Sequence, residues 1–364
     1  MNSKQEILSI HYLRGIAALL VVLLHISWYM GDEWGHLFDA GRIGVDIFFI
    51  ISGFIIAYAT RHGNENTVLF LGKRLVRIYP CLFIVWVFYC VTVFRDANLS
   101  TMIKSLLLFH KNYSAPAPAY DFNLMGTPWT LTYEIYFYIV FSVGMKVSHK
   151  YRSVLCSLFL IALTVISQIT YNGTFEFNRY VSANILVQHW YQVPLKIIST
   201  TITWEFIAGM ALFELRGWLV KYRSKLVEQA LIILSIIYLT MLYVNGGHGL
   251  IFKTGIFYGA FLIFFTALYF EAGNAMFKNK FLHFLGNISY SMYLIHYAIN
   301  QYIRIHTNWI WSDIPGVIKV AAILSLTFVF SYLSYRLIEL PAMKVFKYYI
   351  KRHSVKAHET KLAV

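Results

Sequence analysis

Ten apolar runs constrain this chain more than any other feature, because most of them approach the length of about 20 residues that a membrane-spanning helix needs. Only 13% of the residues are charged and 58% are hydrophobic, whereas a soluble domain usually carries about a quarter charged residues. The sequence therefore predicts an all-α integral membrane protein with about ten transmembrane helices. The expected spans lie at about 12–29, 43–59, 79–94, 128–145, 153–170, 195–214, 229–244, 251–271, 284–302 and 316–338.

The positions of Lys and Arg predict the orientation of these spans. If the N-terminus is cytoplasmic, most of the cations fall in cytoplasmic segments and few in outer ones, which is the usual arrangement in membrane proteins. The even number of spans then places both termini in the cytoplasm. We expect one transmembrane domain over residues 1–340. A basic cytoplasmic tail at 341–364 should lie on anionic lipid headgroups.

The first span carries two ionisable residues, Arg14 and His25, within the run Leu13–Ile26. Eleven helical steps of ~100° bring them to within about 20° of each other, with a rise of ~16 Å. They therefore share one face, with Arg14 at the inner membrane surface and His25 deep in the outer half. This face is expected to line a cavity, since ionisable groups are costly in hydrocarbon. The alternative is a snorkelling Arg and a hydrogen-bonded core His.

Two intramembrane carboxylates are expected at the depth of His25. Asp46 lies about one turn below the outer surface, and Glu134 lies ~9 Å below it at 1.5 Å per residue. A His with a buried carboxylate partner can act as a general base. The alternative is a structural hydrogen-bond network between helices. His296 in the ninth span lies at a similar depth and either lines the same cavity or is a core residue.

Arg74 and Arg77 lie at the inner end of the third span, three residues apart. On a helix this spacing directs both side chains the same way, and two guanidinium groups on one face match phosphate oxygens. Contact with lipid headgroups is the alternative. The chain contains no phosphate-binding glycine loop, dinucleotide fingerprint or metal-spaced His pair. No metal site, nucleotide-driven pump or nucleic-acid partner is therefore expected.

Together these stretches resemble the acyltransferase-3 family of membrane O-acyltransferases, of the polysaccharide and lipopolysaccharide O-acetyltransferase type. The order and spacing of the motifs carry the resemblance over nearly the whole chain. The motifs are Arg14 and His25 with ten residues between them, Gly44–Phe49 followed by Ser52–Phe54, Arg74–Arg77, Trp129–Glu134, Ser289–Tyr290 with Tyr293 and His296, and Ile338–Pro341. Thr130 and Leu340 depart from the family's frequent residues.

The resemblance implies transfer of an acyl group, usually acetyl, from acyl-coenzyme A to a glycan hydroxyl. In the family, the pair that corresponds to Arg14 and His25 is essential for catalysis. Arg74, Arg77 and Arg14 would bind the donor, and His25 would deprotonate the acceptor while Asp46 or Glu134 orients its imidazole. No permanently bound cofactor is implied. The resemblance also implies the bacterial cytoplasmic (inner) membrane and a cell-surface or lipid-linked glycan as acceptor. Transfer would be completed within the membrane domain or by a separate extracytoplasmic partner protein.

Two other functions fit the same residues. A proton-coupled transporter or flippase for a glycan or glycolipid would also place ionisable residues within its spans, but it has no need of paired arginines for donor phosphates. A structural subunit of a polysaccharide assembly complex would need none of the proposed chemistry.

Overall fold

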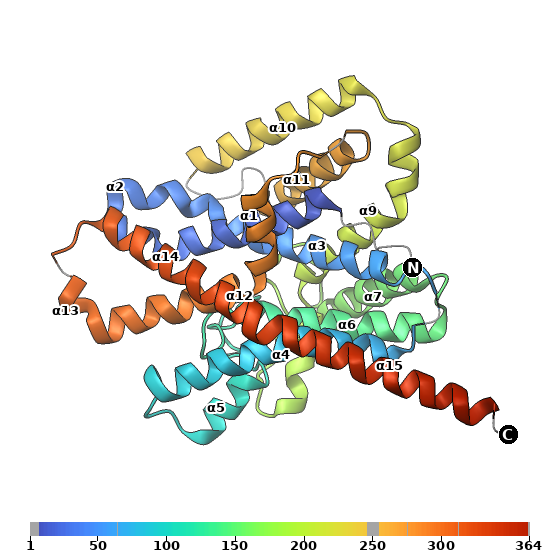
Figure 1. Ribbon diagram of the computed structural model, residues 1–364, viewed down its shortest axis with the longest axis horizontal. Coiled ribbons are helices and arrows are strands. Elements are labelled where there is room, and N and C mark those ends of the chain that lie inside the picture. The colour runs from blue at the N-terminus through green and yellow to red at the C-terminus, as the bar shows by residue number, and fades with distance from the viewer. Residues whose placement is uncertain (1–6, 64, 246–254, 275, 312, 363–364) are drawn as a thin grey trace.

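The computed structural model describes residues 7–63, 65–245, 255–274, 276–311 and 313–362, and every regular element in them is helical (Figure 1). The α-helices are α1 (Leu8–Ile26), α2 (Asp32–Gly35), α3 (Ile43–Ala59), α4 (Thr67–Thr92), α5 (Leu99–Leu106), α6 (Trp129–Val147), α7 (Arg152–Asn172), α8 (Val193–Ile198), α9 (Trp204–Lys221), α10 (Lys225–Val244), α11 (Gly255–Glu271), α12 (Lys280–Tyr302), α13 (Asn308–Trp311), α14 (Gly316–Ser334) and α15 (Leu340–Leu362). Short π-helical segments, η5 (Ile303–Thr307) and η6 (Tyr335–Glu339), follow α12 and α14.

The prediction of an all-helical membrane protein is confirmed in its class. Each of the ten expected runs overlaps a long helix, although residues 251–254 of the eighth run lie outside the described residues. Among the described residues, six helices are long and apolar enough to cross a membrane, or seven if the bent pair at Trp190–Ile198 and Thr201–Lys221 forms one span. The count of ten spans and the cytoplasmic termini stay predictions. The start of α1 and all of α15 lie toward the same end of the molecule (Figure 1).

The helix α1 packs along α12 at the centre of the molecule. The two backbones approach so closely that a Cβ atom on Gly15 would lie 2.6 Å from the amide nitrogen of Gly286. On another face of α1, a Cβ on Gly44 of α3 would lie 2.4 Å from the carbonyl oxygen of Ala17. Small residues permit such close packing between membrane helices. The first helix is therefore fixed on two sides, and its polar side chains are fixed with it.

The long loop before α6 folds onto the helices. Asn123 is fully buried and donates from Nδ2 to the carbonyl oxygens of Ser105 and Phe109, at 3.0 Å each. The loop residue His110 is also buried, with Nε2 at 3.3 Å from Oγ1 of Thr132, and burial lowers the pKa of His110 to about 4. A neutral core histidine at this point positions the first turn of α6, the helix that carries Glu134.

Contact between α3 and α9 gives a test of this packing. A Cβ on Gly209 would lie 2.0 Å from the carbonyl oxygen of Ile50, whereas one on Gly217, two turns further along α9, would meet nothing within 4 Å. We expect Gly209→Ala to lower the thermal unfolding midpoint of the purified protein clearly. The matched change Gly217→Ala should leave the midpoint unchanged or raise it, because Ala favours a helix over Gly by about 1 kcal/mol. Equal effects of the two changes would contradict the close α3–α9 contact.

Candidate active site

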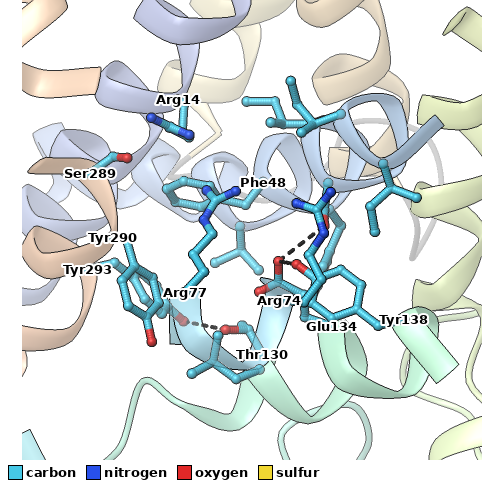
Figure 2. A pocket seen from close by; sticks show the side chains of 17 residues that line it. Arg14, Phe48, Arg74, Arg77, Thr130, Glu134, Tyr138, Ser289, Tyr290 and Tyr293 are labelled. Carbon is cyan, nitrogen blue, oxygen red and sulfur yellow. Dashed lines mark hydrogen bonds between the residues drawn. The ribbon is translucent and has the colours of Figure 1, made fainter. Parts of the chain in front are cut away.

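A cavity between α1, α3, α4, α6 and α12 collects four of the charged residues that the sequence singles out. Arg14, Arg74, Arg77 and Glu134 all line it, together with Phe48, Tyr138 and Tyr293 among others. Figure 2 shows the three guanidinium groups directed toward one space, although they come from two helices. Three arginines around one cavity inside a membrane protein make a strongly positive site, which is suited to an anionic ligand.

The guanidinium group of Arg74 is attracted by Glu134 across the cavity but makes no hydrogen bond to it. Its Nε is buried and has no hydrogen-bond partner within the part of the chain that the structure describes. Its nearest cation-π contacts are the rings of Phe70 and Tyr138, at 5.5 and 5.8 Å from Cζ. Arg14 differs, because its Nη2 donates to the carbonyl oxygen of Gly286 at 2.6 Å. A buried cation without a hydrogen-bond partner is costly, so Arg74 is the group most ready to bind a ligand.

Glu134 supplies the acceptor oxygens of the cavity. Its Oε1 accepts hydrogen bonds from the hydroxyl of Tyr138, one helical turn further along α6, and from Oγ of Ser52 on α3 at 3.2 Å. These hydroxyls hold the carboxylate facing the cavity (Figure 2). The sequence analysis missed Ser52 and Tyr138 as its partners. The spacing of four residues between Glu134 and Tyr138 is the signal that could have identified the second.

A second cavity adjoins the first toward the end of the molecule where α1 begins. The two share six lining residues, among them Arg14, Arg77, Ser289 and Tyr290. The second continues between residues at the start of α1, such as Ile7, and Glu339 at the end of η6 and Met343 of α15. The arginine cavity therefore extends toward the side that the charge distribution assigns to the cytoplasm.

His25 lies beyond the opposite end of the arginine cavity and does not line it. The cavity ends at Phe48, Thr130 and Tyr293, among others. The ring of Tyr293 lies 6.2 Å from that of His296, and Nε2 of His296 lies 3.3 Å from Nδ1 of His25. The structure thus brings Arg14, Arg74, Arg77 and Glu134 together. It places His25 separately, with the aromatic rings of Phe48 and Tyr293 between it and the cavity. His25 itself is partly exposed.

The contacts of His25 define its tautomer. Nδ1 lies 2.8 Å from the carbonyl oxygen of Val21, and because a carbonyl only accepts, Nδ1 must carry the proton. The same reasoning assigns the proton of His296 to Nδ1, which lies 2.9 Å from the carbonyl oxygen of Met292. Nε2 of His25 is then the unprotonated nitrogen of a neutral imidazole. It has no hydrogen-bond partner among the described residues and can accept a proton.

The loop before α6 supports the ring of His25 through Tyr297. The ring of Tyr297 lies 5.4 Å from that of His25, nearly perpendicular to it. Gly126, with φ +81°, packs against the other side of Tyr297 so closely that a Cβ there would lie 2.2 Å from its Cε1. Only glycine suits both this backbone conformation and this contact. Asn300 adds a bond from Nδ2 to the carbonyl oxygen of His25 at 2.9 Å.

The structure corrects the expectation that Asp46 meets His25. Asp46 is 1% exposed and its Oδ1 lies 2.5 Å from Nη1 of Arg179, in the loop after α7. The same Nη1 lies 3.8 Å from Oε1 of Glu205 on α9. The prediction failed because depth below the membrane surface does not show which face of α3 a residue occupies. Glu134 also lies away from His25, in the arginine cavity, so neither carboxylate orients the imidazole in this structure.

Comparison with known proteins identifies relatives along most of the chain. Residues 7–336 match the model of a family described as an acyltransferase domain, of the acyltransferase-3 type. The exopolysaccharide production protein ExoZ of Rhizobium meliloti (strain 1021) is 27% identical over 74% of this chain and 80% of its own length. No solved structure shows a significant match.

Two further relatives are longer than the region they share with this chain. The acyltransferase MdmB of Streptomyces mycarofaciens is 28% identical over 38% of this chain and 39% of its own length. A Staphylococcus aureus (strain COL) protein, provisionally named an O-acetyltransferase, is 26% identical over 91% of this chain. The match covers 56% of that protein, so the chain spans about half of its length.

Arg179 gives a test of the charge cluster. Arg179→Gln leaves Asp46 and Glu205 buried without their cation, and removal of one partner of a buried pair typically costs about 3–5 kcal/mol. We expect a large fall in the unfolding midpoint of Arg179→Gln. The double change Asp46→Asn with Arg179→Gln should recover much of the loss, because it removes both charges of the pair. A double variant no more stable than Arg179→Gln would contradict the pairing.

Proposed function

The chain belongs to the acyltransferase-3 family, and from this premise we propose that it is an acyl-coenzyme A-dependent O-acyltransferase of the bacterial cytoplasmic membrane. The acyl group, acetyl in the simplest case, passes to a hydroxyl of a cell-surface or lipid-linked glycan on the outer side. The relative named for exopolysaccharide production and the one named for O-acetyl transfer support this acceptor and this reaction.

The observation that carries the proposal is the arginine cavity. Coenzyme A brings several phosphate groups, and Arg14, Arg74 and Arg77 surround one space with Arg74 lacking a hydrogen-bond partner in the described residues. Charge-assisted bonds from guanidinium to phosphate are among the strongest in proteins. The second cavity gives the donor an approach from the expected cytoplasmic side. The narrow pantetheine arm would point from these arginines toward Tyr293.

The proposed chemistry uses the free nitrogen of His25. Nε2 takes the proton of the acceptor hydroxyl as its oxygen attacks the thioester carbonyl. The carbon–sulfur bond breaks, the new ester forms, and the imidazolium returns the proton to the departing thiolate of coenzyme A. Nδ1–H shares its proton between the carbonyl oxygen of Val21 and Nε2 of His296. These two acceptors take the orienting and stabilising role for which a carboxylate was expected.

The route needs one local movement. Phe48 and Tyr293 pack edge-to-face at 5.8 Å between centroids and lie at the end of the cavity nearest His296. The hydroxyl of Tyr293 donates to the carbonyl oxygen of Thr127 at 2.7 Å and lies 2.9 Å from Oγ1 of Thr130. In the proposal these rings close the cavity without donor and turn aside when the thioester arrives, which keeps water from the thioester until then.

Thioester turnover tests the proposed activity and the role of His25. The purified protein, given acetyl-coenzyme A and a glycan fraction from its host, should release free coenzyme A in step with the acetylated glycan. His25→Asn should lower this rate by at least a hundredfold, the lower bound of a general-base contribution. His36→Asn is the control, since His36 is 75% exposed in its side chain and lies outside the cavity. Glycan transport without coenzyme A release would contradict the proposed enzyme activity and show that the protein is a carrier.

Arg74 gives a test of donor binding. We expect Arg74→Gln to raise the KM for acetyl-coenzyme A by ten- to a hundredfold, because a hydrogen bond to a charged group contributes about 1.5–3 kcal/mol. Lys73→Gln removes the same charge from the neighbouring position, but Lys73 pairs with Glu65 and does not line the cavity. Its KM should stay unchanged. A similar rise in KM for both variants would contradict a specific contact of Arg74 with the donor, because loss of any positive charge in this region would then have the same effect.

A further inference from the structure

A long apolar groove separates α4 from α14. Its floor is α12, which packs against both helices, while α4 meets the last long helix mainly at η6 and α15. The helices α4 and α14 therefore lie close together near η6 and diverge toward the opposite, expected outer end. Lining residues include Ile84 and Phe88 of α4, Ile299 of α12, and Phe330 and Leu333 of α14.

The groove matches a hydrocarbon chain in composition and in length. Ser334, Thr307 and Cys81 are among its few lining residues with a polar side-chain atom, and Cys81 and Ser334 contact each other at 3.3 Å. Along α14 and η6 the lining runs from Leu326 to Ile338, which is about 18 Å at 1.5 Å per residue. Since a hydrocarbon leaflet is roughly 15 Å deep, the groove accommodates a tail longer than one leaflet.

The floor of the groove belongs to α12, which contacts the proposed general base His25 of α1. Ile295, Ile299 and Ile303 of this segment line the groove, each four residues from the next. The residues that follow them, His296 and Asn300, contact His25 instead. One face of α12 thus lines the groove, and the adjacent face of α12 contacts His25 of α1.

The cationic side chain of Arg304 follows α12 at its expected outer end, between the face that lines the groove and the face that contacts His25. Arg304 comes four residues after Asn300 and directly after Ile303, in η5. It is exposed, has no hydrogen bond or ion pair among the described residues, and lies near enough to Tyr29 to act on its hydroxyl electrostatically. That hydroxyl donates to Asn300 at 3.0 Å. Arg304 is therefore two helical turns, roughly 12 Å, above His296 on the His25 side.

We infer that the acceptor is a glycan carried on a lipid phosphate, with its hydrocarbon tail in this groove, its phosphate on Arg304 and its sugar beside His25. This inference rests on the proposed function and narrows its acceptor to one class. Bulk lipid is as apolar as the groove, so the groove supplies alignment of the tail more than affinity. The phosphate contact sets the height of the sugar relative to Nε2 of His25, which is the positioning that transfer requires.

Photolabelling tests the site without any donor. The probe is a polyprenyl diphosphate–N-acetylglucosamine with a diazirine in its tail, added to the full chain in nanodiscs, and labelled peptides are mapped by mass spectrometry. We expect labelling of α4 and α14 along the groove. Leu333→Trp should reduce it at least fivefold. The control Val329→Trp lies one turn away on the same helix, exposed but outside the groove, and should label normally.

The proposed contact between the phosphate and Arg304 is tested by a variant and a matched control. Arg304→Gln should raise the probe concentration for half-maximal labelling at least fivefold, whereas Arg95→Gln, at the exposed outer end of α4, should not. Equal competition by phosphatidylglycerol, or labelling insensitive to Leu333→Trp, would overturn the inference and leave bulk lipid as the occupant. Acetyl transfer to soluble glycans without labelling would refute this inference alone. Labelling without acetyl transfer would refute the proposed enzyme and leave the lipid site.

Discussion

The close contact between α1 and α12 is the interaction on which the rest of the site depends. Gly15 and Gly286 let the two backbones meet, and contacts on either side of this point hold the two residues that matter most. Arg14 donates to the carbonyl oxygen of Gly286, and His25 contacts His296 and Asn300. One helix pair therefore holds both ends of the proposed route, so the distance between them varies little while side chains between them turn.

The buried charged side chains are compensated to different degrees at two places in the helix bundle. Near Asp46 the charge is compensated, because Arg179 extends from the loop after α7 to lie between Asp46 and Glu205. In the arginine cavity Glu134 is held by hydroxyls, and Arg74 has an unpartnered Nε within the described residues. Since unpaired charge within a membrane protein is expensive, the first arrangement is typical of a structural tie and the second of a binding site. This contrast is why we assign Asp46 to the fold and Arg74 to the ligand.

The sequence was sufficient to predict the class of fold and the pairing of Arg74 with Arg77, because hydrophobic length and helical spacing are local properties. It could also place Arg14 and His25 on one helix. It could not predict that Asp46 faces Arg179, since that contact joins residues far apart in the chain through a loop without regular pattern. Nor could it show that Phe48 and Tyr293 separate His25 from the arginines. Such features depend on how helices rotate against each other, which a single sequence does not record.

The central claim is that donor and acceptor meet at His25 from opposite sides of the membrane. Its most direct measurement uses proteoliposomes in which the protein has one known orientation, with acetyl-coenzyme A and acceptor each confined to one side. We expect ester formation only when the donor is on the side of Glu339 and Met343 and the acceptor is on the side of Arg304. Equal ester formation with both substrates on one side would contradict it.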